Sequence, residues 1–181
     1  LGRDELELNF QPVVDAVTEE ILSFEALMRW NSVEFGRVSP AKFIPIAEDT
    51  RLIVPIGEWA LRRACDEAAH WPGHVKVSFN VSAEQMLDAN FASTVVSALA
   101  ASGLAPERLE LEVTESIFLR DGGAAQSTLN QIQSLGCKLA LDDFGTGYSS
   151  LGYLRNNRFN TIKIDRSFVT GAAKDSPESL A

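Results

Sequence analysis

The sequence contains few of the residues that sulfur- and nitrogen-ligated metal sites require. Its 181 residues include two cysteines and two histidines. Cys65 and Cys137 lie far apart, and neither belongs to a metal-ligand spacing. We therefore expect both thiols to be buried and reduced, as in a cytoplasmic protein. No apolar run is long enough to span a bilayer, so direct membrane insertion is not expected.

Positive charge is also scarce, with 16 lysines and arginines against 25 acidic residues and a net charge of −9. This balance argues against a surface that binds nucleic-acid polymers or anionic membranes. It leaves room for a small anionic ligand held through cations. The hydrophobic content of 45% is ordinary for a globular protein, and the length fits one domain over residues 1–181.

Short apolar strands alternate with helical patterns along the chain, which predicts an α/β fold with parallel pairing and crossover connections. Residues 31–39 read as a loop. Helices are expected near 40–47, from Pro55 to Trp71, from Ser82 to Ser102 and near 124–135. Strands are expected at 6–14, 21–30, 76–82, 109–114, from Lys138 and at 161–165.

Two adjacent carboxylates, Asp142 and Asp143, end the apolar run that begins at Lys138. Adjacent side chains on a strand point to opposite faces, so both can serve one site only if the backbone turns there. Gly145 and Gly147 permit such a turn. Two acids at the carboxyl end of a buried strand are typical of metal-binding α/β enzymes. A solvated Asp-Asp turn is the structural alternative.

Five strands each carry one polar residue with a parity opposite to that of its apolar neighbours, at or near the carboxyl end. These residues are Glu25, Asn80, Glu112, Asp142 and Lys163. In a parallel barrel this is where catalytic groups lie. Oxygen ligands favour Mg²⁺ or Mn²⁺, and enough are present for two ions that would support in-line phosphoryl displacement. Two alternatives remain: proton abstraction by Lys163 beside a substrate carboxylate, as in magnesium-dependent enolase-like barrels, and ligand binding without chemistry.

The segment Glu25-Ala26-Leu27-Met28-Arg29-Trp30 resembles the signature of EAL domains, the cyclic di-GMP phosphodiesterases of bacterial signalling. The resemblance continues in order along the chain. It runs through Phe10-Gln11-Pro12, Ser39-Pro40, Phe43-Ile44-Pro45, Asn80-Val81-Ser82, Glu112-Val-Thr-Glu115-Ser116, Asp142-Asp143-Phe144-Gly145-Thr146-Gly147 and Lys163-Ile164-Asp165. Each short motif alone is weak evidence for the family, whereas the ordered series of motifs is highly specific for it.

This resemblance implies a TIM-like (β/α)8 barrel with an antiparallel first strand, of which this chain carries about six strands. It implies hydrolysis of cyclic di-GMP to linear pGpG with two Mg²⁺ or Mn²⁺ ions. From the oxygen chemistry of the site we expect Ca²⁺ to occupy it as an inhibitor. Lys163 would orient or deprotonate the attacking water, with Glu25 and Asp142 also catalytic. The implied metal ligands are Glu25, Asn80, Glu112, Asp142 and Asp143.

The resemblance also implies roles around the metal site. Gln11, Leu27 and Arg29 would bind the substrate, with core packing the alternative for Leu27 and a surface ion pair for Arg29. Glu115 would anchor the loop from Phe144 to Ser150 and couple metal binding to dimerisation; a helix-start cap is its alternative.

The implied setting is a cytoplasmic homodimer fused to sensory or GGDEF-type domains, which can itself be the cytoplasmic part of a membrane-attached protein. A catalytically inactive receptor of the same fold is the competing function. Such receptors typically lose metal ligands, and here every matched ligand is present.

The chain departs from the family pattern at a few positions. Arg51 stands where the family usually has glycine, and Asn157-Arg158 replaces an apolar residue and proline. Residues 176–179 resemble a helix start, yet the chain ends at Ala181 before the last two barrel strands, so it is either truncated or incompletely observed. If those strands are absent, we expect unpaired strand edges and little activity.

Overall fold

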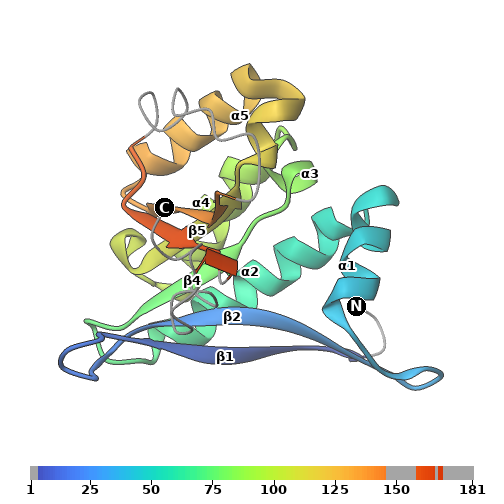
Figure 1. Cartoon of the computed structure of the whole chain (residues 1–181), viewed down its shortest axis with the longest axis horizontal. Helices are drawn as coiled ribbons and strands as arrows, with labels where there is room; N and C mark the ends of the chain where they lie inside the picture. The colour runs from blue at the N-terminus through green and yellow to red at the C-terminus, as the bar shows by residue number, and fades with distance from the viewer. Residues whose placement is uncertain (1–3, 146–157, 166, 169–181) are drawn as a thin grey trace, which may run out of the picture.

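The strands form one mixed sheet on which the fold is built (Figure 1). The structure is a computed structural model and describes residues 4–145, 158–165 and 167–168. The sheet order is β1-β2-β4-β5-β6-β7, with β3 paired to β2. The strands are β1 (Leu6–Val14), β2 (Ile21–Ser32), β3 (Gly36–Val38), β4 (Lys76–Asn80), β5 (Leu109–Thr114), β6 (Lys138–Phe144) and β7 (Thr161–Ile164).

The first strand pairs antiparallel with β2, whereas β2, β4, β5, β6 and β7 pair in parallel. The antiparallel first strand that the family resemblance implied is therefore confirmed. Parallel pairing brings the carboxyl ends of five consecutive strands to one end of the sheet. Within the described residues the sheet stays open between β1 and β7.

Helices follow most of the parallel strands, as the alternating pattern predicts. Figure 1 shows β1 and β2 along one edge of the molecule, with the helices beyond β2. The helices are α1 (Pro40–Asp49), α2 (Ile53–Ala69), α3 (Ala83–Met86), α4 (Phe91–Ser102), α5 (Ser116–Ser134) and the short 3-10 helix η1 (Pro106–Arg108). Among the described helices, none combines the length and apolar character needed to cross a membrane.

The hydrophobic core lies between the sheet and the helices. One parity of each strand supplies it, for example Val77 and Phe79 from β4 and Leu111 from β5. The helices contribute their apolar faces, including Leu61 from α2 and Leu129 from α5. Since side chains alternate along a strand, the other parity is left for the interior of the curved sheet.

The predicted helix from Ser82 to Ser102 is wrong as a single element, because α3 ends at Met86 and α4 begins at Phe91. The Asp88 carboxylate accepts a hydrogen bond of 2.9 Å from the backbone N–H of Asn90. Such local side-chain bonds compete with helix formation and turn the chain.

Other boundaries also differ from the sequence prediction. The helix expected near 124–135 begins at Ser116, the one expected from Pro55 begins at Ile53, and the predicted loop 31–39 contains β3. The first turns of α5 were not predicted, because Gly122 and Gly123 have low helix propensity. The strand β3 has three residues, too few for a periodic pattern.

Candidate functional site

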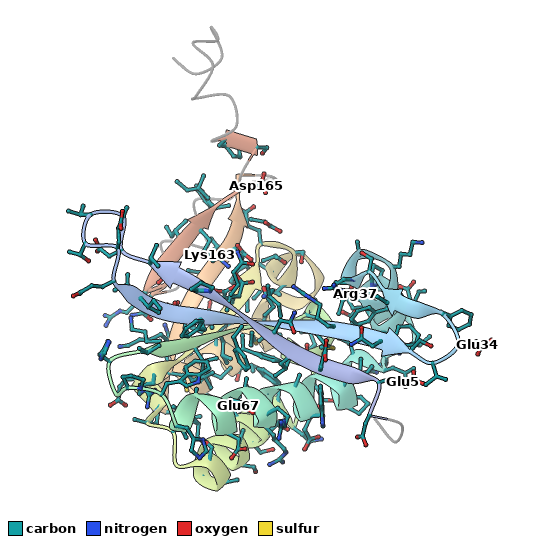
Figure 2. The ribbon with its side chains drawn as sticks, turned by 90° about the horizontal axis from the view of Figure 1, so that it is seen from below. Glu5, Glu34, Arg37, Glu67, Lys163 and Asp165 are labelled. Carbon is teal, nitrogen blue, oxygen red and sulfur yellow. The ribbon has the colours of Figure 1, made fainter. Side chains whose placement is uncertain are left out.

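The ammonium group of Lys163 is the centre of an acidic cluster. Its Nζ lies 3.1 Å from Oε2 of Glu25, 2.6 Å from Oε2 of Glu112 and 3.6 Å from Oδ2 of Asp142. The first two contacts are hydrogen bonds that Lys163 donates. Figure 2 shows Lys163 on its strand, on the side toward the long β1–β2 pair. One cation thus faces three carboxylates.

The four charged residues come from four strands, and a fifth strand contributes Asn80. The amide Nδ2 of Asn80 donates a hydrogen bond of 2.8 Å to Oε1 of Glu25. The parallel register explains this convergence, because Asn80 is paired with Glu112, and Thr114 with Asp142. The structure therefore brings together five polar side chains that the sequence placed only by parity.

Burial differs sharply within this cluster. The Glu112 side chain is 3% exposed, whereas those of Glu25, Asp142 and Lys163 are 18%, 21% and 29% exposed. Burial raises the pKa of Glu112 to about 7, although the hydrogen bond and charge of Lys163 act to lower it. Burial thus acts against the charged form of Glu112, while the ammonium of Lys163 favours that form.

The pKa of Lys163 shifts in the direction that favours its charged form. Burial lowers the pKa of Lys163, but the hydrogen bond to Glu112 and the charges of Glu112, Glu25 and Asp142 raise it more, so the net shift is upward. Lys163 is therefore an ammonium ion at neutral pH. Two of its N–H donors are used in the hydrogen bonds to Glu25 and Glu112.

Asp143 lies at the turn that ends β6. Its φ is +53°, and its backbone N–H donates a hydrogen bond of 2.9 Å to Oδ1 of Asp142. Gly145 follows with φ +97°, while Gly147 lies outside the described residues. The backbone therefore departs from regular strand geometry at Asp143, and β6 continues to Phe144, one residue beyond the two acids. Burial and the neighbouring charge of Asp142 raise the pKa of Asp143.

A cavity of about 660 Å³ adjoins the cluster through Asn80. Leu27 and Arg29 from β2 line it, as the substrate prediction requires, and the Arg29 Nη1 donates to the carbonyl of Met28 at 2.9 Å. Gln11 lies on β1 opposite Glu25 in the register and is exposed, but it is not among the lining residues. Its part in substrate binding stays a prediction.

Sequence reasoning missed several residues of this cavity, including Pro40, Ile44 and Ser82. Each belongs to a segment that carried the family resemblance, so a signal was present, but no function was inferred from it. Pro40 and Ile44 lie on α1, which packs against β2, and Ser82 is the N-cap residue of α3. The lining is mixed, with acids at Glu48, Asp49 and Glu84.

Glu115 occupies the residue before α5, but its side chain makes no capping hydrogen bond there. The helix-cap alternative is therefore wrong. Of the loop that Glu115 was predicted to anchor, residues 146–150 lie outside the described part of the chain, as does Asn157. The anchoring role stays a prediction.

The donor chemistry of the cluster fits a hard divalent cation, because it consists of carboxylate and amide oxygens. Three carboxylates against one ammonium also leave excess negative charge. As the described side chains are placed, no three histidine, cysteine or acidic residues form a metal-holding group. They are arranged around the ammonium of Lys163, so a cation would bind beside it after side-chain adjustment.

Comparison with known proteins was made against families, curated sequences and solved structures. A curated protein of Sinorhizobium fredii, y4lL, is 50% identical over 181 residues, which is 100% of this chain and 22% of that protein. The bifunctional diguanylate cyclase/cyclic di-GMP phosphodiesterase MucR of Pseudomonas aeruginosa is 42% identical, covering 99% of this chain and 27% of MucR. The solved PaMucR phosphodiesterase in complex with c-di-GMP matches with a TM-score of 0.91 and 40% identity, covering 99% of this chain and 74% of that one.

The fold and the acidic cluster define a TIM-like α/β barrel with its polar groups at the carboxyl ends of the strands. The EAL domain family model matches residues 1–180, and the chain belongs to this family. It spans about a quarter of the length of the curated relatives reported above.

Proposed function

We propose that the chain carries the active site of a metal-dependent phosphodiesterase that hydrolyses cyclic di-GMP to linear pGpG. The observation that carries this proposal is the ammonium of Lys163 within 3.6 Å of three carboxylates, beside a cavity of about 660 Å³. Membership of the EAL family supports it, as does the activity that the name of MucR states for that relative.

Five residues would hold one or two Mg²⁺ or Mn²⁺ ions: Glu25, Asn80, Glu112, Asp142 and Asp143. When bound, such ions supply an activated water and neutralise phosphate charge. The chain's own residues do the rest. Lys163 orients the attacking water through its N–H donors, and Arg29 offers a planar fork of donors to a phosphate in the cavity.

The reaction adds water across one phosphodiester bond of the ring. The water oxygen becomes bonded to phosphorus, one P–O3′ bond breaks, and the released 3′ oxygen takes up a proton. Catalysis by Glu25 and Asp142 consists of holding Lys163 and the ions in place. The geometry favours this reaction because cavity and cluster share Asn80 and the end of β2.

The length of the relatives supports one part of the proposed setting, namely that the domain belongs to a longer protein. The domain works within a longer cytoplasmic protein, as a homodimer joined to sensory or GGDEF-type domains, and Ca²⁺ in place of Mg²⁺ inhibits it.

The test is incubation of the full-length protein with cyclic di-GMP and Mg²⁺ or Mn²⁺, followed by chromatography of the nucleotides. We expect linear pGpG, its loss on chelation, and a fall of roughly 100-fold or more in Glu25→Ala. Glu58→Ala is the matched control, because Glu58 pairs with Arg62 on the exposed side of α2. Binding of cyclic di-GMP without cleavage would show that the protein is a receptor. The absence of both binding and cleavage would overturn the proposal.

A further inference from the structure

A second polar layer lies directly beneath the acidic cluster. Its members stand two residues before members of the cluster on the same strands, so they face the same interior. Ser78 lies below Asn80 on β4, Glu110 lies below Glu112 on β5, and Thr161 lies below Lys163 on β7. Nothing in the proposed reaction uses this lower layer.

Glu110 is the unusual member of that layer, because it is a carboxylate that is 8% exposed. The Oγ1 of Thr161 donates a hydrogen bond of 2.7 Å to its Oε1, and the Oγ of Ser78 donates a longer one of 3.5 Å to its Oε2. In the described part of the chain, no lysine or arginine nitrogen lies within 4.0 Å of it. Burial of a carboxylate is costly without such bonds, so the bond to Thr161 is its main compensation.

The strand that carries Lys163 has an irregular backbone register beside that residue. β7 is the last strand of the described sheet and pairs with β6 at Thr161, Ile162 and Ile164. The register is irregular between Leu141 and Phe144, where the residue opposite would be Lys163. Backbone pairing therefore positions Lys163 less directly than its neighbours Ile162 and Ile164, which have register partners on β6.

Two interior bonds pass across β6 and tie β7 to the buried strand β5. The upper one joins Lys163 to Glu112 at 2.6 Å, and the lower one joins Thr161 to Glu110 at 2.7 Å. The upper bond belongs to the reactive cluster and must adjust to ligands. The lower bond is remote from the ligand cavity and stays available throughout the reaction.

We propose that Glu110 is a positioning residue, whose hydrogen bond from Thr161 fixes β7 so that Lys163 lies among the carboxylates of the cluster. The inference rests on the proposed function of Lys163. It assigns the Glu110–Thr161 pair a task that neither residue performs through contact with substrate. Loss of either partner lets β7 move relative to β5, which displaces the Lys163 ammonium from Glu112.

The test uses the full-length protein with Glu110→Ala, Glu110→Gln and Thr161→Val. We expect kcat for cyclic di-GMP to fall roughly 10–100-fold in Glu110→Ala and Thr161→Val, with KM changed by less than about threefold. Glu110→Gln keeps an acceptor oxygen and is expected to recover most of the lost kcat. The double variant Glu110→Ala/Thr161→Val should be no slower than either single variant, because each substitution removes the same hydrogen bond.

Thr128→Val is the matched control for Thr161→Val. Thr128 donates to the carbonyl of Ala124 within α5, away from the site, so we expect wild-type kcat. If Glu110→Ala does not fold, Thr161→Val decides, since it keeps the Glu110 carboxylate and its bond from Ser78. Wild-type kcat in Thr161→Val, or failure of Glu110→Gln to recover activity, overturns the positioning role.

Crystal structures of wild type and Thr161→Val without ligand supply a readout independent of turnover. We expect the distance between Lys163 Nζ and Glu112 Oε2 to lengthen by more than about 1 Å, beyond hydrogen-bonding reach. A displaced Lys163 in a protein whose wild type does not cleave cyclic di-GMP would refute the proposed function and support the positioning role. An active wild type with Lys163 unmoved in Thr161→Val would do the reverse.

Discussion

Arg51 joins α1 to α2 with a left-handed backbone, at φ +58°. A residue with a Cβ atom pays about 1–2 kcal/mol for this conformation, whereas glycine adopts it freely. The family resemblance implies glycine at this position, and the backbone gives the physical reason. The turn keeps its shape because the N–H of Arg51 donates to the carbonyl of Glu48 at 2.9 Å.

Replacement of Arg51 by glycine is therefore expected to stabilise the protein by about 0.5–1 kcal/mol, after the greater freedom of glycine in the unfolded chain is deducted. Urea unfolding of the domain measures the change. Arg51→Ala is the control, because alanine keeps the strained conformation and should bring no gain. Equal stabilisation by both variants would show that the arginine side chain, and not the backbone, is unfavourable.

The two cysteines behave as apolar core residues. Cys65 is 0% exposed and Cys137 is 4% exposed. Burial raises the pKa of the Cys65 thiol to about 12 and that of Cys137 to about 11. The reactive thiolate is thus a very small fraction of either residue at pH 8.

We expect iodoacetamide at pH 8 to leave both cysteines unmodified in the native protein and to alkylate both after denaturation. Mass spectrometry of the peptides that contain Cys65 and Cys137 makes the measurement specific to these residues. Rapid native alkylation of Cys65 would contradict its position in the core between α2 and the sheet.

At the scale of elements, Arg108 terminates the helix α2 from a distance in sequence. Its Nη2 donates to the carbonyls of Ala68 at 2.7 Å and Val75 at 2.8 Å, and its Nε donates to Val75 at 2.9 Å. These bonds satisfy carbonyl groups at the end of the helix and in the turn before β4. A single guanidinium therefore links α2, β4 and η1.

Arg108→Met is expected to lower the free energy of unfolding by about 1.5–3 kcal/mol, as for hydrogen bonds made by charged groups. Arg108→Lys should recover little of it, because an ammonium cannot reproduce the planar fork. Denaturant unfolding gives the values. Arg62→Met is the matched control, since its exposed pair with Glu58 should contribute less than about 1 kcal/mol.

Most helices and strands could be predicted from the sequence because each carries a periodic apolar pattern over enough residues to be recognised. The parity of β5, with Leu109, Leu111 and Val113 opposite Glu110 and Glu112, placed a strand and both its faces correctly. Features shorter than one period could not be predicted in this way. The break between α3 and α4 and the strand β3 depend on local side-chain bonds and on pairing with a partner strand.

At the scale of the whole molecule, the sequence indicated which side chains share the site but not how they are arranged. Parity and strand ends selected Glu25, Asn80, Glu112, Asp142 and Lys163, and the parallel sheet brings them together. Their mutual distances depend on register and sheet curvature, which no residue pattern encodes. The central position of Lys163 and the lower bond to Glu110 therefore required the structure.

The acidic cluster also leads to a prediction about the stability of the whole protein. Three carboxylates surround one ammonium, so a divalent cation that enters the cluster removes charge repulsion in the native state alone. Binding to the native state stabilises it by about 2.7 kcal/mol at a free concentration of 100 times Kd. We expect the Tm of the full-length protein to rise on addition of Mg²⁺ or Mn²⁺ and to fall again on chelation.

Differential scanning calorimetry with and without the ion measures this increment. Asp142→Asn should lose most of it, whereas Asp66→Asn, at an exposed residue of α2, should keep it. Ca²⁺ should also raise the Tm, because oxygen ligands accept it, while turnover falls if it inhibits. An equal rise in Tm for Asp142→Asn and wild type would show that the ion binds elsewhere. The acidic cluster would then not be the metal site.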